Sequence, residues 1–306
     1  MGLKQFAGLL VIGIIVSGGA VQTAEAQVYT GPQSIDTTIA IDHNGSLRVS
    51  VYSGRVSVTS ASGNNVRVKG RLERGDLEVR SRAGSVSLSM DENPSRSRAD
   101  LDITVPVGTN VVLEGFSAIF AVRGVKGEAQ VETLSGDVQV SDASGMIQVE
   151  TVSGSITVTK ADGDVRAESV SGLVTIAGVN GDVDAETVSG RVSITEAKSR
   201  SVRAETVGGS ITYSGTIDPM GNYVFKSHAG RLTLGIPTDA GATVGLQTFS
   251  GTVDSDFPVT LEGGRSQVGH ESKFEFRIGN GRSRIVLETF SGDIKLQRGL
   301  TRGTQE

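Results

Sequence analysis

A short block of sequence recurs at a fixed interval through the middle of this 306-residue chain. The block follows the pattern Glu-Thr-Val-Ser-Gly and continues with alternating apolar and polar residues. Three steps between copies are eighteen residues and the last is nineteen. The copies are VETLSGDVQV from Val131, VETVSGSITV from Val149, AESVSGLVTI from Ala167, AETVSGRVSI from Ala185 and AETVGGSITY from Ala204. A fixed short period indicates a repeat architecture, in which each unit packs mainly against its neighbours.

A finer period of nine residues divides each block. Glycine recurs every nine residues from Gly127 to Gly190 and resumes, one residue late, at Gly209. Each nine-residue unit contains an apolar-x-apolar segment, which is typical of a strand with one buried face. We interpret each glycine as a corner whose backbone angles a side chain would resist. The sequence therefore predicts an all-β protein, a parallel, β-helix-like β-solenoid with nine-residue half-repeats and eighteen-residue coils.

Stacking the coils in register would align equivalent side chains in files along the solenoid. We predict two inward files from the alternating strand, a third inward file at the corner before the glycine, and small residues at the opposite corner. The first file is Val138, Ile156, Val174, Val192 and Ile211, and the second is Val140, Val158, Ile176, Ile194 and Tyr213. The third is Leu134, Val152, Val170, Val188 and Val207, and the opposite corner holds Ala143, Ala161, Val179 and Ala197.

The N-terminus has the features of a secretory signal peptide. Lys4 precedes an apolar run over 6–16, and Ala24-Glu25-Ala26 matches the small-residue pattern at which signal peptidase cleaves. The run is short for a membrane span of roughly twenty residues, and an uncleaved anchor is the alternative. We predict a signal peptide over 1–26, no transmembrane segment after its removal, and a periplasmic or extracellular mature protein.

The rest of the chain is expected to form a single domain. An extended lead-in over 27–35 precedes one solenoid over 36–297. Within the solenoid, the polar stretch 90–100 is expected to protrude as a loop. Over 218–297 the period loosens and phenylalanines collect, which indicates irregular capping coils. A frayed polar tail over 298–306 follows.

Several blocks occur in an order that resembles a known family. These blocks are Pro106-Val107-Gly108, the repeated Glu-Thr-Val-Ser-Gly, Phe249-Ser250-Gly251 and the stretch 287–296. In this respect the chain is similar to the bacterial "putative adhesin" family of uncharacterised β-strand-repeat domains, over about residues 36 to 297. The resemblance implies an exported, non-enzymatic β-solenoid, and it supplies no ligand and no site residues.

The sequence argues against an enzyme or a metal protein. His43, His228 and His270 lie far apart and form no spaced metal motif, and cysteine is absent. The nine-residue period lacks the second glycine and the regular aspartate of calcium-binding β-rolls. A repeat places many carboxylates in identical surroundings, whereas acid–base catalysis needs carboxylates in different environments. We therefore predict no catalytic residues, no metal ion and no cofactor.

One predicted outward file is acidic. Glutamate takes the same slot in six successive coils, and no basic residue is adjacent to it in sequence. Unit charges about 5 Å apart repel by about 1 kcal/mol in water, so the file is tolerable. It is either a solvated edge or an extended site for cations or a basic partner. The six residues are Glu114, Glu132, Glu150, Glu168, Glu186 and Glu205.

Hydroxyl residues form further files. Beside the glutamates, Thr151, Ser169, Thr187 and Thr206 are expected to hydrogen-bond backbone groups of the corner. On the other sheet, Thr157, Thr175, Ser193 and Thr212 are expected to point outward in a flat file. A flat hydroxyl face suits a polysaccharide or ice, although outward threonine is also simply a good strand former.

Together these features predict an exported, non-enzymatic structural or binding module, adhesin-like, that contacts an envelope or extracellular polymer. The partner would be a cell-surface or envelope polysaccharide or protein. The alternative is a periplasmic accessory protein that recognises a protein partner through the edges or surfaces of the solenoid. A solenoid polysaccharide lyase or hydrolase ranks third, because 4% aromatic residues are few for a catalytic groove. With a formal net charge of −5, no nucleic-acid partner is predicted.

The signal peptide gives the first testable prediction. Cleavage after Ala26 should leave Gln27, or its cyclised form, as the N-terminal residue of the native protein. Mass spectrometry of the protein isolated from cells measures this directly. Recovery of intact Met1 in an envelope fraction would show an uncleaved anchor instead.

Overall fold

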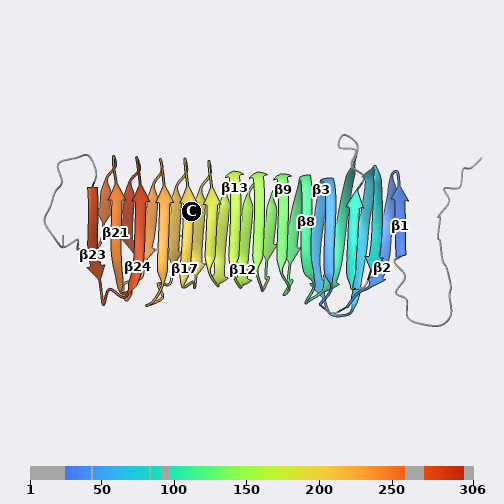
Figure 1. Cartoon of the computed structure of the whole chain (residues 1–306), viewed down its shortest axis with the longest axis horizontal. Helices are drawn as coiled ribbons and strands as arrows, with labels where there is room; N and C mark the ends of the chain where they lie inside the picture. Colours follow the sequence, from blue (N-terminus) through green and yellow to red (C-terminus); the bar gives the residue numbers. More distant parts are fainter. Residues whose placement is uncertain (1–24, 43, 83, 91–96, 259–271, 300–306) are drawn as a thin grey trace, which may run out of the picture.

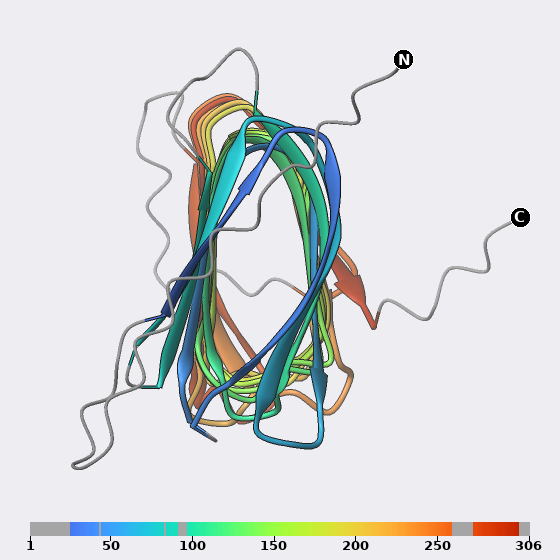
Figure 2. The same cartoon turned by 90° about the vertical axis from the view of Figure 1, so that its right-hand side faces the viewer.

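The computed structural model describes residues 25–42, 44–82, 84–90, 97–258 and 272–299. These residues form 25 strands joined in one continuous sheet, and no helix occurs among them. The strands stack side by side along one long axis, with β1 (Glu25–Thr30) at one end and β23 (Ser272–Ile278) at the other (Figure 1). Seen end-on, the sheet closes into a flattened tube (Figure 2). The predicted all-β solenoid is confirmed, and most of its strands pair in parallel as predicted.

Two walls face each other across the core in the central coils. β8 (Asn110–Arg123) runs through both walls. The first wall continues with β9 (Ala129–Ser135), β11 (Ile147–Ser153), β13 (Val165–Ser171), β15 (Val183–Thr187), β17 (Ser201–Thr206) and β19 (Asn222–Ser227). The second wall continues with β10 (Val138–Ser141), β12 (Ile156–Asp162), β14 (Val174–Asn180), β16 (Val192–Ala197), β18 (Ile211–Gly215) and β20 (Leu232–Ile236).

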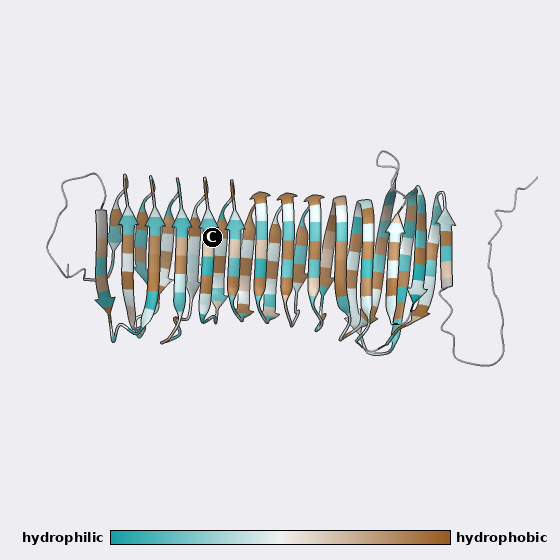
Figure 3. Ribbon diagram, viewed as in Figure 1, coloured by the Kyte–Doolittle hydropathy of each residue, from teal (hydrophilic) through white to brown (hydrophobic). Residues whose placement is uncertain are grey.

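The register of the second wall follows the repeat. Val138 pairs with Ile156, and Ile156 pairs with Val174, each eighteen residues further along the chain. Every member of both predicted inward files is buried, and so are the small residues of the opposite corner. Along each strand, apolar and polar residues alternate (Figure 3). The core is therefore a stack of identical layers, to which each buried aliphatic side chain contributes roughly 1.5–3 kcal/mol.

The third predicted inward file is wrong. Leu134, Val152, Val170, Val188 and Val207 are 41–52% exposed. The cause is strict alternation along the first wall, because the extended chain continues through the Glu-Thr-Val segment. Val149 points inward, Glu150 outward and Thr151 inward, which leaves Val152 on the outside. A hydroxyl residue, 4–6% exposed in these coils, thus takes the buried corner position.

The recurring glycines fall into two groups. Gly136, Gly145 and Gly163 have φ values of 147°, 85° and 155°, as our interpretation of the corners requires, whereas close stacking explains the others. Gly154, Gly172 and Gly190 do not have a left-handed φ, contrary to our interpretation of these corners. A Cβ added to Gly172 or Gly190 would lie less than 3.0 Å from the carbonyl oxygen of the glycine in the preceding coil. The backbones of successive corners therefore touch, and a side chain has no room between them.

At the opposite corner, residues other than glycine adopt a left-handed φ. Asp142, Lys160 and Glu196 each have a φ of 53°, and Gly178 between them has a φ of 67°. Such a conformation costs a non-glycine residue roughly 1–2 kcal/mol. It shifts the alternation by one residue, so that Ala161 follows exposed Lys160 into the core. The shift explains how this corner is filled by small side chains.

The N-terminal end is not purely parallel. β3 (Ser46–Ala61) pairs in parallel with β8 on one side, and with β6 (Ser85–Met90) and β7 (Arg98–Pro106) on the other. Beyond them, β4 (Asn65–Arg74) and β5 (Asp76–Arg82) run antiparallel to β7 and β6, and β2 (Gln33–Ala40) and β1 run antiparallel to β4 and β5. The parallel pairing predicted for the whole solenoid is thus wrong at this end, where β5 and β6 form an antiparallel pair and Gly84, just before β6, has a φ of 77°.

At the C-terminal end, sequence order and spatial order differ. β24 (Ser283–Thr289) lies between β19 and β21 (Ala242–Thr248), and β25 (Ile294–Arg298) lies between β20 and β22 (Val253–Ser255). β23 runs antiparallel to β21 at the far end. The last coil in the sequence therefore inserts inside the preceding one. Most of the predicted signal peptide, of the predicted loop at 90–100 and of the predicted tail lies outside the described residues.

The stacked glycines give a testable prediction. Gly190→Ala should lower the melting temperature strongly, since overpacking costs roughly 1–3 kcal/mol and here the clash is with backbone. Gly208→Ala is the matched control, because its Cβ would meet one atom at 3.7 Å, an ordinary contact. We expect Gly208→Ala to change stability by less than about 0.5 kcal/mol. Equal losses in thermal unfolding would contradict the stacking argument.

Candidate functional site

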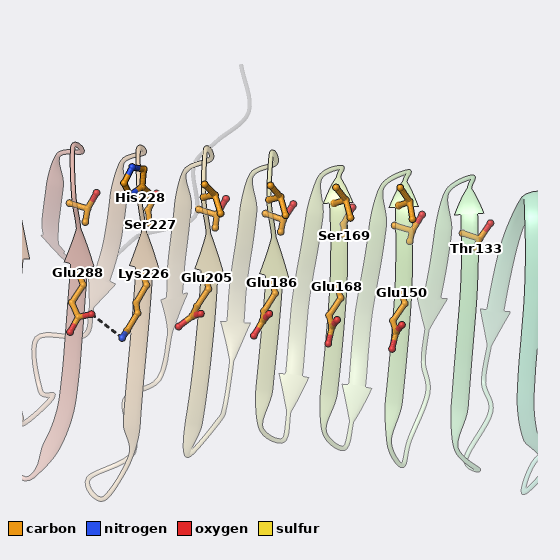
Figure 4. A pocket seen from close by; sticks show the side chains of 18 of the residues that line it. Thr133, Glu150, Glu168, Ser169, Glu186, Glu205, Lys226, Ser227, His228 and Glu288 are labelled. Atoms are coloured by element: carbon orange, nitrogen blue, oxygen red, sulfur yellow. Dashed lines mark ion pairs between the residues drawn. The ribbon is translucent and has the colours of Figure 1, made fainter.

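The six predicted glutamates form one continuous file on the outside of the first wall. The register pairs Glu114 with Glu132, and the pairing continues coil by coil to Glu205. Stacked parallel strands bring successive members to about 4.8 Å apart. The file then continues through Lys226, Glu288 and Gln247, with Lys226 Nζ 2.9 Å from the Glu288 carboxylate (Figure 4).

The glutamates have neighbouring hydrogen-bond donors, although no basic residue is adjacent to them in sequence. Two positions before Glu132 and Glu150, the amides of Gln130 and Gln148 donate hydrogen bonds of 2.7 Å. Arg166 Nε lies 2.5 Å from Glu168 in the same relation. The donor two residues earlier lies on the same face of the strand, which is why adjacency in sequence missed it.

Glu186 has its partner in a neighbouring coil. The residue two positions before it is Asp184, an acid rather than a donor, and Arg203 of the next coil contacts Glu186 at 3.4 Å. The same arginine contacts Glu205, two positions after it, at 2.8 Å. Glu114 is paired with Arg48 of β3. Compensation is therefore uneven, with arginine at Glu114 and from Glu168 to Glu205 but neutral amides at Glu132 and Glu150.

The ionised side chain of Asp184 lies in an energetically unfavourable environment. Its Oδ1 is buried without a hydrogen-bond partner, and the nearest cation, Arg203 Nε, is 3.8 Å away. Burial raises the pKa of Asp184 above its usual value, repulsion by Glu186 raises it further, and Arg203 opposes the shift. The ionised carboxylate is therefore destabilised in the folded state.

The exposed apolar file forms a ridge parallel to the glutamates. We define the apolar ridge as Phe116, Leu134, Val152, Val170, Val188, Val207, His228, Phe290 and Phe249. At one end the ring of Phe116 stacks on Tyr52 with centroids 4.8 Å apart. At the other end Phe290 stacks between His228 and Phe249, at 5.0 and 4.9 Å. The ridge is thus aliphatic in the middle and aromatic at both ends.

A groove of about 1170 Å³ runs between the glutamate file and the apolar ridge. The buried hydroxyl residues also line it, and in the described part of the chain the backbone hydrogen bonds predicted for them are present at Ser169 and Thr206 but not at Thr151 and Thr187. Thr206 Oγ1 and Ser227 Oγ donate to the carbonyl oxygens of Gly190 and Gly209 at 3.4 and 3.1 Å. Thr151 and Thr187, in the same file, have no hydrogen-bond partner for their hydroxyl within the described residues. The structure therefore brings all six predicted glutamates into one site, beside a ridge whose aliphatic residues are predicted from the sequence to lie in the core.

The second hydroxyl file lies elsewhere. Thr157, Thr175, Ser193 and Thr212 pair in register on the outside of the second wall, and all four are half-buried. They share the outer surface with Gln139 and Thr233 of the adjoining coils. This file does not contribute to the groove.

The structure describes one of the three histidines. His228 belongs to the apolar ridge, whereas His43 and His270 lie outside the described residues. Within the described ranges, no group of three or more His, Cys, Asp or Glu side chains is arranged to hold a metal ion. No helix in the same ranges is long and apolar enough to cross a membrane.

Asp184 gives a prediction about pH dependence. A carboxyl group with a raised pKa in the folded state destabilises the fold above that pKa and is neutral in both states below its unfolded value. Asp184→Asn should therefore raise the melting temperature at pH 7, and the gain should vanish below about pH 3.8, the ordinary pKa of an aspartate side chain. Glu132→Gln, an exposed position with an amide partner, is the control and should give a smaller gain. An equal gain from Asp184→Asn at both pH values would contradict the assignment.

Comparison with known proteins gives a family. No curated protein matches the chain. A "putative cell adhesion protein" from Clostridium sporogenes is 11% identical, with 87% of this chain and 100% of that one covered and a TM-score of 0.27. "Putative adhesins" from Bacteroides fragilis and Parabacteroides distasonis are 11% and 10% identical, with TM-scores of 0.43 and 0.40. Each match covers 86% of this chain and 97% of the other. The family model described as Toastrack DUF4097 matches residues 38–212 and 129–297. Most of the chain is covered by these matches, and the chain belongs to the Toastrack DUF4097 family.

Proposed function

We propose that this protein is an exported, non-enzymatic binding module that holds an extended polymer of the cell envelope or its surroundings in the groove. The observation that carries the proposal is the apolar ridge. Soluble monomeric proteins rarely expose a large contiguous apolar surface unless it binds something. Here aliphatic side chains from five successive coils, Leu134 to Val207, are each at least 41% exposed beside a file of carboxylates.

The uniformity of the groove favours binding over catalysis. Successive glutamates lie on the same face of equivalent strands, and most accept a hydrogen bond from a side chain two residues earlier or one coil away. Acid–base chemistry needs two groups whose surroundings push their pKa values apart. A surface that repeats every coil instead suits a ligand that also repeats, which is a polymer.

Export and the adhesin-like role rest on other grounds. The apolar run and Ala24-Glu25-Ala26 support secretion, and the family resemblance supports a role at the cell surface or in the envelope. A module without an enzymatic site would act there by holding two components together. The alternative role, as a periplasmic accessory protein that binds a protein partner, uses the same groove.

Retention on envelope material tests the proposal. Purified mature protein should sediment with an isolated bacterial envelope fraction. The variant Val152→Thr/Val170→Thr/Val188→Thr keeps the shape and strand propensity of the ridge but makes it polar, and it should lose most of this retention. These exposed changes should each alter stability by less than about 0.5 kcal/mol.

A variant of the second wall is the matched control. Thr157→Val/Thr175→Val changes the same number of atoms per site in the opposite direction and should leave retention unchanged. Loss of retention in this variant, with the ridge variant unaffected, would place the binding surface on the hydroxyl file. No retention of the wild-type protein would overturn the proposed function itself.

A further inference from the structure

The shape of the groove restricts its occupant. The glutamate file and the apolar ridge are two residues apart along each strand, which is about 6.6 Å. The groove crosses nine coils, and its 1170 Å³ exceeds the roughly 300–1000 Å³ of pockets for drug-sized molecules. A site this long and this narrow takes a linear chain lying along the solenoid axis, and it is too narrow for an α-helix of about 10–12 Å diameter.

The two sides of the groove differ in chemistry. One side presents carboxylates and the other presents aliphatic side chains over the central coils. An extended polypeptide directs successive side chains to opposite sides. A chain lying in the groove would therefore place every second side chain on the ridge and the others on the glutamates.

We infer that the groove binds an extended polypeptide segment in which cationic and aliphatic side chains alternate. The inference rests on the proposed function and names the polymer. Ten such residues span about 33 Å, which corresponds to about seven coils of 4.8 Å. Side chains on one side of an extended segment recur about every 6.6 Å, whereas the coils recur about every 4.8 Å. Lysine and arginine side chains are long and flexible enough to reach the carboxylates despite this difference in spacing.

Other occupants fit less well. A second copy of this chain matches the coil spacing, but it would bring its own glutamate file against this one, and like charges across an interface are strongly unfavourable. A neutral polysaccharide leaves the carboxylates without charged partners, and the stacking rings it favours occur only at the two ends of the ridge among the described residues. A linear polyamine supplies the charge but has no side chains for the ridge.

The charge distribution locates the strongest part of the site. Glu168, Glu186 and Glu205 contact arginines, whereas the partners of Glu132 and Glu150 in the described part of the chain are neutral amides. Next to them, Leu134 and Val152 are 41% and 42% exposed. Cationic side chains of the bound segment should therefore be held most tightly at these two coils.

Peptide binding to the full mature protein tests the inference. The probe is a fluorescently labelled ten-residue peptide of alternating lysine and valine, used at nanomolar concentration and followed by anisotropy at low and physiological salt. The comparison peptide has the same composition with five lysines followed by five valines. We expect the alternating peptide to bind at least about threefold more tightly, because only it can satisfy both sides of the groove at once.

Two groove variants and one control complete the experiment. Glu132→Gln/Glu150→Gln and Val152→Thr/Val170→Thr should each weaken binding by about three- to tenfold, the range of two exposed ion pairs or two lost apolar contacts. Glu196→Gln/Asp239→Asn removes two carboxylates outside the groove and should change binding by less than about twofold. Melting temperatures within a few degrees of the wild type would show that all three variants are folded.

The outcomes separate this inference from the proposed function. Equal affinity for the two peptides, competition by spermine at the same charge concentration, or no effect of the valine variant would each overturn the inference in favour of a general cation-binding surface. Absence of peptide binding while the protein is still retained on envelope material would overturn the inference and leave the proposed function standing. Peptide binding that follows the expected pattern without envelope retention would support the ligand class inferred for the groove and overturn the proposed function.

Discussion

Contact between the backbones of successive glycine corners is the constraint on which this structure depends. At Gly172 and Gly190 the carbonyl oxygen of the preceding coil occupies the space of a Cβ. Coils that touch there are held at the spacing of parallel strands, about 4.8 Å, throughout the stack. Equivalent side chains must then lie directly above one another. The nine-residue period of glycine therefore reflects this contact between backbones. The alignment of side chains into files on the surface follows from the same contact.

In a stack of this kind, each position of the repeat forms a line of equivalent side chains along the molecule. Where the line points inward, as at Val138 and Ile156, it becomes a continuous core. Where it points outward, a residue with little effect in one coil is multiplied along the whole molecule, as for Val152 in the apolar ridge. The same multiplication makes a localised catalytic centre difficult to build, because each coil repeats the surroundings of the last. Long, shallow binding surfaces are the natural product of such a fold.

The alternation and the period of the sequence predicted the inward files correctly. The prediction failed where the apolar character of a residue was given more weight than the alternation. The files of Val138 and Val140 follow from apolar-x-apolar spacing alone. Val152 was assigned to the core because it is apolar, although counting outward from buried Val149 places it with Glu150 on the outside. The same count would have found Gln148 as the donor to Glu150. The insertion of β24 between β19 and β21 could not be foreseen, because a local repeat contains no information on the order in which coils stack.

The negative charges of the glutamate file are compensated by arginines in some coils and not in others. An in-register stack can therefore tolerate a line of like charges and still have a surface that differs along its length. Adjacent carboxylates about 5 Å apart repel by about 1 kcal/mol in water. Arg166 and Arg203 relieve this repulsion in the later coils, and Lys226 interrupts the file where Glu288 follows. The two glutamates whose partners are neutral amides, Glu132 and Glu150, therefore both lie in the earlier coils. Because they lie on one side of the coils that contain Arg166 and Arg203, an occupant with unevenly distributed cationic charge would prefer one direction along the solenoid.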